Sequence, residues 1–141
     1  MKKLSSKSAG DAGEYYIAYM LSRLGISSAL TTSGTSAVDI IATIDGSKSI
    51  SVQVKASWAR TAPRQWMVGK NKPHASDSLF YIFCNLSEDI HNDHTPEVFI
   101  VPSRDILMKS TWQHQVPLFK ISKEFESAYQ DKWDVIIRAL S

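Results

Sequence analysis

The sequence lacks the features that mark secreted, membrane-spanning or disulfide-rich proteins. Its one cysteine, Cys84, excludes an intrachain disulfide and a cysteine-based zinc site. No apolar run approaches the ~20 residues that a membrane-spanning helix needs, and the basic start, Met1–Lys7, is not followed by the apolar core of a secretory signal. We therefore expect a cytoplasmic protein with no membrane partner, built as one domain over residues 1–141.

Two common catalytic motifs are also absent. The chain has neither the G-x-x-x-x-G-K-[ST] loop of nucleotide-binding ATPases nor the G-x-S-x-G turn of serine hydrolases, so no nucleotide cofactor is expected. His91 and His94 stand near Asp89 and Asp93, but without the regular spacing of metal ligands. That stretch is interpreted as a solvated loop.

Acidic residues are scarce in the first half of the chain. Residues 1–76 hold ten lysines and arginines against four aspartates and glutamates, whereas residues 77–141 hold six against ten, so the net charge of +2 hides a strong asymmetry. Between Asp45 and Asp77 there is no acidic residue at all. A local positive field of this kind is typical of a face that meets an anion. The alternative is a solvated face that the acidic second half balances in space.

Apolar periodicity predicts an α/β fold. The spacing of Ile17, Leu21 and Leu24 predicts a helix over Ser8–Gly25, with Gly25 as its left-handed terminus. Strands are predicted at Ser27–Thr32, Val38–Ile44, Ser49–Ser57, Gln65–Val68, Leu79–Asn85 and Glu97–Val101, the last two apolar enough to be central.

Two more helices are predicted toward the end of the chain. One spans Pro102–Lys109, with its proline in the first turn. The other spans Asp131–Leu140 and has one apolar face, formed by Trp133, Ile136, Ile137 and Leu140. This order of elements predicts a mixed β-sheet of about five strands, flanked by helices.

Polar side chains share one face of a predicted hairpin. Gln53 and Lys55 alternate with apolar residues and therefore point the same way, about 7 Å apart by two strand rises. A three-residue turn, Asp45–Ser47, would pair Asp39 with Gln53 and place Asp39 on that face as well. A turn with an even number of residues would place Asp39 on the opposite face.

A glutamate extends the buried stripe of the first predicted helix. Glu14 shares a face with Ile17 and Leu21 at helical spacing. A carboxylate on a buried stripe is costly unless it is paired or binds a metal. The alternative is that Glu14 lies at an exposed helix start, where its charge favours the helix dipole.

Together, Gly13-Glu14, Val38-Asp39 and Gln53-Val54-Lys55 resemble the motif of the PD-(D/E)XK nuclease superfamily. Members of that superfamily place an Asp on the second strand and an acidic-x-Lys on the third, and many have a glutamate on the first helix. The resemblance covers residues 8–57 and extends loosely to 79–103. Val38 replaces the proline of the motif and Gln53 replaces its acidic residue, a Gln-x-Lys variant that occurs in active branches related to Mrr-type enzymes.

The resemblance implies a restriction-endonuclease-like core and a Mg²⁺-dependent DNA endonuclease that hydrolyses phosphodiester bonds with a metal-activated water. It implies that Glu14, Asp39, Gln53 and the Val54 carbonyl hold Mg²⁺ or Mn²⁺, and that Lys55 positions the water or stabilises developing charge. A homodimer is expected because one site cuts one strand.

The alternative function is a catalytically inactive DNA-binding or protein-interaction module, such as an accessory protein of a defence system, with Gln53 marking the loss of activity.

The basic segment 58–76 follows the strand that carries Lys55. We predict that it grips the DNA backbone. The predicted nucleic-acid contacts are Ser57, Arg60, Arg64, Lys70 and Lys72. Trp58 and Trp66 lie among these residues and either stack on bases or cover the core, and for tryptophan the core is the favoured interpretation.

Overall fold

A mixed sheet forms the centre of the molecule. The computed structural model describes residues 3–32, 38–58, 64–91 and 95–141. Among these residues the sheet has five strands, of which β3 and β5 pair in parallel and all other neighbours pair antiparallel. In spatial order the strands are β1 (Ser27–Leu30), β2 (Ile40–Thr43), β3 (Ser49–Trp58), β5 (Leu79–Leu86) and β6 (Glu97–Pro102).

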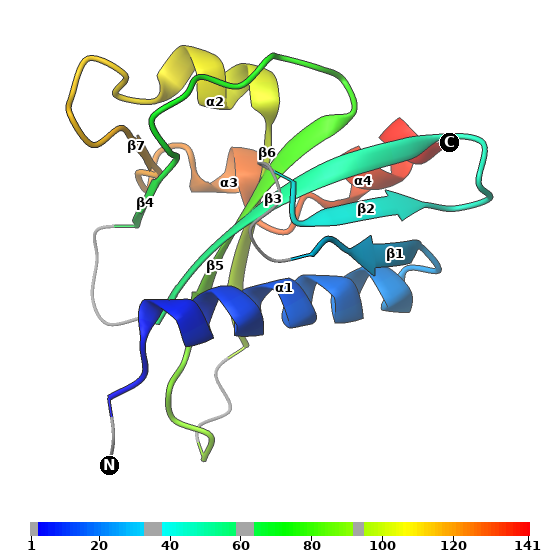
Figure 1. Ribbon diagram of the computed structural model, residues 1–141, viewed down its shortest axis with the longest axis horizontal. Coiled ribbons are helices and arrows are strands. Elements are labelled where there is room, and N and C mark those ends of the chain that lie inside the picture. The colour runs from blue at the N-terminus through cyan, green and yellow to red at the C-terminus, as the bar shows by residue number, and fades with distance from the viewer. Residues whose placement is uncertain (1–2, 33–37, 59–63, 92–94) are drawn as a thin grey trace.

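Helices cover this sheet, and a second, two-stranded sheet packs beside it (Figure 1). These elements confirm the predicted α/β fold with a mixed five-stranded sheet flanked by helices. The helices are α1 (Ser6–Arg23), α2 (Ser103–Lys109), α3 (Glu126–Tyr129) and α4 (Trp133–Leu140), and the small sheet joins β4 (Gln65–Met67) to β7 (Leu118–Lys120). The sequence predicted neither β7 nor α3, because both are too short to show a period.

The first helix begins and ends where capping groups satisfy its backbone. The Ser5 side chain accepts a hydrogen bond from the Ser8 N–H at 3.1 Å. At the other end Gly25 has φ +77°, and the N–H groups of Gly25 and Ile26 donate to the carbonyls of Ser22 and Leu21. The prediction of a left-handed Gly25 is therefore confirmed.

Strand alternation sorts the core into two layers. Even-numbered side chains such as Val52 and Ile82 pack with Ile17 and Leu21 of α1 and with α4. Odd-numbered side chains of β5 and β6, including Phe83, pack on the other face against the small sheet, α2 and α3. The face of the sheet opposite α1 is therefore covered over β5 and β6.

Three predicted placements are corrected by this packing. Leu24 is 38% exposed because it is the C-cap of α1, and Ile137 is 37% exposed because Ile136 and Leu140 define the buried side of α4. β6 is the last strand of the sheet and is not central. Its apolar composition has another cause, since both of its faces are covered and a bridge from Phe99 to Gln130 lies along its outer side.

The hairpin has the register that the sequence predicted. β2 pairs with β3 from Ile40↔Val52 to Thr43↔Ser49, which is the predicted register, and Asp39 lies just before the paired residues. The turn is longer than predicted and spans residues 44–48. It is held by side-chain hydrogen bonds to the backbone N–H groups of residues 46 and 47. The longer turn keeps odd parity, so residues 40–43 keep the predicted register, whereas Asp39 lies outside the ladder and its N–H donates to the Val52 carbonyl.

Helix α1 crosses β3 at a point where no side chain fits. A Cβ atom added to Gly13 would lie 2.5 Å from the Cβ of Ala56 and 3.4 Å from a methyl of Val54. The residue that follows is Glu14, so this close approach sets how near Glu14 lies to the sheet. Gly10, one turn earlier in the same helix, has nothing within 4 Å of the same hypothetical atom.

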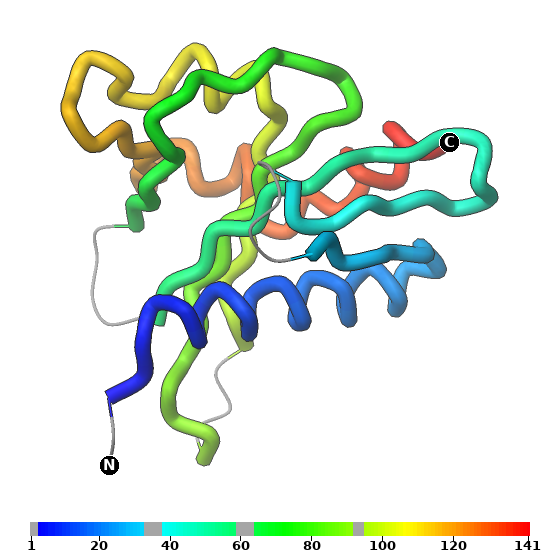
Figure 2. The backbone as a smooth tube through the Cα atoms, viewed as in Figure 1, coloured from blue at the N-terminus to red at the C-terminus, as the bar shows by residue number. Residues whose placement is uncertain are grey.

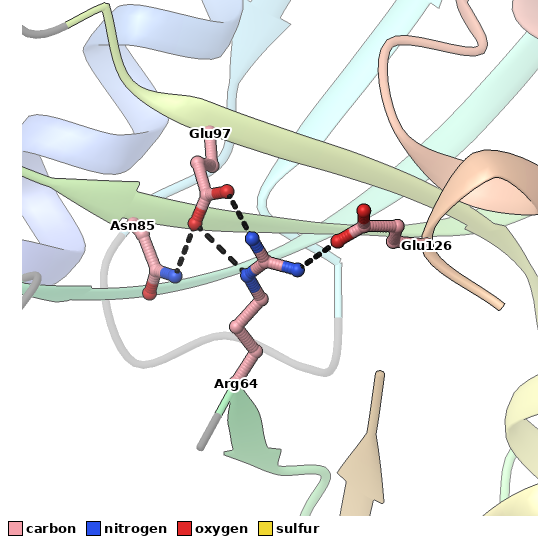
Figure 3. Close-up of polar contacts among 4 residues, drawn as sticks. All are labelled: Arg64, Asn85, Glu97 and Glu126. Carbon is pink, nitrogen blue, oxygen red and sulfur yellow. Dashed lines mark hydrogen bonds and ion pairs between the residues drawn. The ribbon is translucent and has the colours of Figure 1, made fainter. Parts of the chain in front are cut away.

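A polar network ties the small sheet to the main sheet (Figure 3). Arg64 donates to both carboxylate oxygens of Glu97, at 3.2 and 2.8 Å, and forms an ion pair with Glu126. Asn85 donates to Glu97 at 3.0 Å and accepts a hydrogen bond from Ser57 at 3.0 Å. The network therefore joins β3, β5, β6 and α3 to the residue that precedes β4.

No helix in the described ranges combines the length and the apolar character needed to cross a membrane.

We predict that Gly13→Ala and Gly10→Ala change stability in opposite directions. Gly13→Ala forces a contact with the backbone-anchored Cβ of Ala56 and is expected to lower the free energy of unfolding by about 1–3 kcal/mol. Gly10→Ala is expected to raise it by about 0.5–1 kcal/mol because alanine favours the helix. Urea denaturation measures both values. Equal shifts in the two variants would show that α1 does not touch β3 at Gly13.

A second matched pair tests the polar network. Arg64→Met removes the cation between Glu97 and Glu126 and is expected to lower the free energy of unfolding by about 2 kcal/mol. Arg104→Met breaks a 3.4 Å pair with Asp77 whose side chains are 66% and 98% exposed, so a loss below about 0.5 kcal/mol is expected. If Arg64→Met were as mild as Arg104→Met, the network would not hold the two sheets together.

Candidate functional site

Asp39 lies at the edge of β3, where the pairing with β2 ends. Its N–H donates to the Val52 carbonyl at 2.9 Å, and its carboxylate accepts the N–H of Val54 at 2.8 Å. The contact arises because even-numbered residues of β3 direct their backbone groups toward β2. The N–H and C=O of a strand residue point to the same side, so the Val54 carbonyl faces the edge that Asp39 occupies.

Gln53 and Lys55 lie side by side on the face opposite α1. In the parallel ladder they are level with Tyr81 and Phe83 of β5. Both side chains are half-buried. The Gln53 Oε1 atom is buried and has no hydrogen-bond partner among the described residues. Leaving such an acceptor unpaired costs about 1–3 kcal/mol, and a bound ion or water is a common explanation of an orphaned group.

Glu14 belongs to α1, which packs on the other face of the sheet from Gln53 and Lys55, and it lies within electrostatic range of Asp39. It is half-buried at the flank of the apolar stripe, well inside a helix that begins at Ser6, so the alternative of an exposed helix start is wrong. Burial raises the pKa of Glu14, and the negative charges of Asp39 and Asp11 raise it further. The influence of Asp39 indicates that two carboxylates from separate elements converge here.

Asp39 lies between opposing electrostatic influences. Burial raises its pKa above the ordinary value, while the N–H of Val54 and the ammonium of Lys55 act in the other direction. Its carboxylate is therefore within the electrostatic range of Lys55 as well as that of Glu14. The structure therefore links Asp39 electrostatically to Glu14 of α1 and to Lys55 of β3.

The donor set at this edge suits a hard divalent cation. Its oxygens come from two carboxylates, the Gln53 amide and the Val54 carbonyl, which are the ligand types that Mg²⁺ prefers. A cation held at Asp39 would offset the repulsion between the Glu14 and Asp39 carboxylates, and the orphaned Gln53 oxygen would be a further donor on the same strand edge. Within the described ranges, no cluster of three or more histidine, cysteine, aspartate or glutamate side chains forms a metal centre.

The predicted nucleic-acid contacts fall into three groups. Lys70 and Lys72 are exposed in the segment between β4 and β5. Arg64 and Ser57 have partners within the protein. Arg64 belongs to the network of Figure 3, and the Ser57 hydroxyl donates to Asn85 of that network. Arg60 lies outside the described residues. The sequence missed the pairing of Arg64, because Glu97 and Glu126 come near it only through the fold.

The other candidate residues behave as ordinary structural groups. Cys84 is buried, and burial raises its pKa to about 12, which keeps the thiol protonated at neutral pH. The backbone N–H of His91 donates to the Asp89 carboxylate, as in a solvated turn. Asp93 and His94 lie outside the described residues.

The fold is similar to that of a protein of known structure, although sequence comparisons find no relative. No protein-family model matches the sequence, and no curated protein matches it. Among solved structures, a bacterial homing endonuclease, I-Ssp6803I, superposes with a TM-score of 0.65 at 15% sequence identity, over 98% of this chain and 95% of that one. At this identity the likeness concerns the fold, and it spans both chains almost completely. The protein therefore has a nuclease-like α/β fold, shared with this homing endonuclease.

Proposed function

We propose that the protein is a divalent-metal-dependent DNA endonuclease that hydrolyses phosphodiester bonds. The observation that carries the proposal is the Asp39 carboxylate, which the Val54 N–H holds where the β2–β3 pairing ends and which lies within electrostatic range of Glu14 and Lys55. Its nuclease-like fold, shared along nearly the whole chain with a homing endonuclease, supports it. The matching PD-(D/E)XK-like spacing of the same residues supports it independently.

In this proposal four oxygen donors hold Mg²⁺ or Mn²⁺. They are the Glu14 and Asp39 carboxylates, the Gln53 amide oxygen and the Val54 carbonyl. When bound, a divalent cation supplies a water nucleophile at neutral pH and neutralises charge on the phosphoryl oxygens. Asp39 is positioned in advance, because its carboxylate already accepts the Val54 N–H, and a preorganised group needs little rearrangement during the reaction.

Lys55 acts on the reacting phosphate. Strand geometry places it about 7 Å along β3 from Gln53, on the same face. From there its ammonium donates to the attacking water or to the phosphoryl oxygen on which negative charge develops. The same cation reduces the repulsion between an incoming phosphate and the two carboxylates.

The proposed partner is DNA, bound through its phosphates. Exposed Lys70 and Lys72, together with Arg60, are the proposed backbone contacts, and they supply affinity without sequence preference. Arg64 is left out of this surface, because its guanidinium already pairs with two carboxylates. Ser57 is retained as a neutral contact beside Lys55. A homodimer is proposed, since one site cuts one strand.

We predict cleavage that depends on the metal and on two charged residues. Supercoiled and branched DNA are incubated with the protein in Mg²⁺, in Mn²⁺ and in EDTA, and nicked and linear products are measured on gels. Asp39→Ala and Lys55→Ala are each expected to lower the rate at least ~100-fold. Glu124→Ala and Lys123→Ala, which change exposed residues between β7 and α3, are expected to cut like the wild type.

Two results would count against an active enzyme. One is a wild-type protein that cuts no DNA in either metal, and the other is cleavage that survives both Asp39→Ala and Lys55→Ala. DNA binding without cleavage would instead favour the inactive DNA-binding module, which is supported by the lack, among the described residues, of a cluster of three or more histidine, cysteine, aspartate or glutamate side chains.

Gln53→Glu tests the metal site without any DNA. The added carboxylate is expected to raise Mg²⁺ affinity roughly tenfold, because ligand charge sets the affinity of such sites. Without metal, a third carboxylate is expected to lower the melting temperature. Titration calorimetry and thermal unfolding with and without Mg²⁺ measure these changes. Gln115→Glu, at an exposed position, is the control, and equal Mg²⁺ affinity in the two variants would place the cation elsewhere.

A further inference from the structure

A cavity of about 500 Å³ opens directly beside the candidate site. Its walls come from the start of α1, the end of β3 and the small sheet, and Figure 2 shows the start of α1 and the end of β3 meeting at one corner of the molecule. Lys55 lines the cavity and also belongs to the candidate site. A ligand group in the cavity would therefore lie next to the phosphate on which Lys55 acts.

The lining is aromatic and carries no negative charge. Trp58, Trp66 and Met67 line the cavity with Lys55, and none of the described residues that line it is an aspartate or glutamate. Trp66 is 5% exposed and is held by stacking on Phe83, with ring centroids 4.9 Å apart. Its Nε1 is buried without a hydrogen-bond partner among the described residues.

Trp58 and Met67 supply the accessible surface. The Trp58 indole is half-buried, and its Nε1 donates to the Ser5 carbonyl at 3.0 Å, which fixes the ring between β3 and the start of α1. Met67 is 65% exposed, so its thioether is free to pack on a ligand. A fixed indole and a polarisable sulfur suit a flat, uncharged, aromatic group.

We propose that this Trp58 cavity binds one unpaired nucleobase of DNA, adjacent to the phosphate that is cut. The inference rests on the proposed function, because Lys55 serves both the cavity and the reaction. A base is flat and stacks on indole rings, its flanking phosphates are attracted to Lys55, and the volume is ordinary for a ligand site. Because a base inside a paired duplex is out of reach, the preferred substrate carries an unpaired nucleotide, as a bulge or a single-stranded flap does.

Binding assays in EDTA test the cavity without catalysis. Fluorescence anisotropy compares three labelled duplexes, which are fully paired, carry a one-nucleotide bulge, or carry the same bulge with an abasic nucleotide. The wild type is expected to bind the base-bearing bulge roughly 5- to 100-fold more tightly than the abasic one. Trp58→Leu and Met67→Ala are expected to reduce this difference. Met108→Ala is the matched control, an exposed methionine on α2 that is 72% exposed, and it is expected to keep the difference.

The outcomes separate the cavity from the nuclease. Equal affinity for base-bearing and abasic bulges overturns the base site, even if the protein cuts DNA in Mg²⁺. A base preference that Met67→Ala reduces and Met108→Ala keeps supports the site, even if no DNA is cut. Thermal unfolding checks that Trp58→Leu is folded. If it is not, the comparison of Met67→Ala with Met108→Ala alone tests whether the cavity binds a base.

Discussion

The close approach of α1 to β3 is the constraint on which the candidate site depends. Gly13 lies where any side chain would collide with Ala56, so the helix lies flush against the strand. The next residue, Glu14, is thereby brought near enough to Asp39 for the two carboxylates to influence each other. Because β3 also pairs with β5 and anchors the first core layer, a shift of α1 would disturb both the core and the site.

In the folded protein, a basic residue of the first half is paired with acidic residues of the second half, and others stay exposed. Arg64, from the basic half, forms ion pairs with Glu97 and Glu126 from the acidic half. For this residue the alternative holds in which the acidic second half balances the positive charge of the first. Lys70 and Lys72 remain exposed, and Lys55 stays beside a single cluster of two carboxylates. The positive charge that remains for an anionic partner is therefore smaller than the sequence count suggests, and part of it lies next to the candidate site.

The cavity beside Lys55 changes how the tryptophans are interpreted. Composition favours tryptophan as a core residue, and Trp66 fits that interpretation, since it is stacked on Phe83 and buried. Trp58 is held by its hydrogen bond to the Ser5 carbonyl and lines the cavity. One tryptophan therefore supports the second core layer, while the other lines a surface beside the proposed chemistry.

Local regularities in the sequence determined much of this protein. Alternation in residues 49–57 placed Gln53 with Lys55, odd parity of the turn set the register of β2 against β3, and Gly25 ended the first helix. Each of these follows from the geometry of one helix or one hairpin. The tertiary structure alone decided the pairing of Arg64, the place of β6 at the sheet edge, the small sheet of β4 and β7, and the cavity at Trp58. These features join segments far apart in the chain, and no local period records which distant segments will meet.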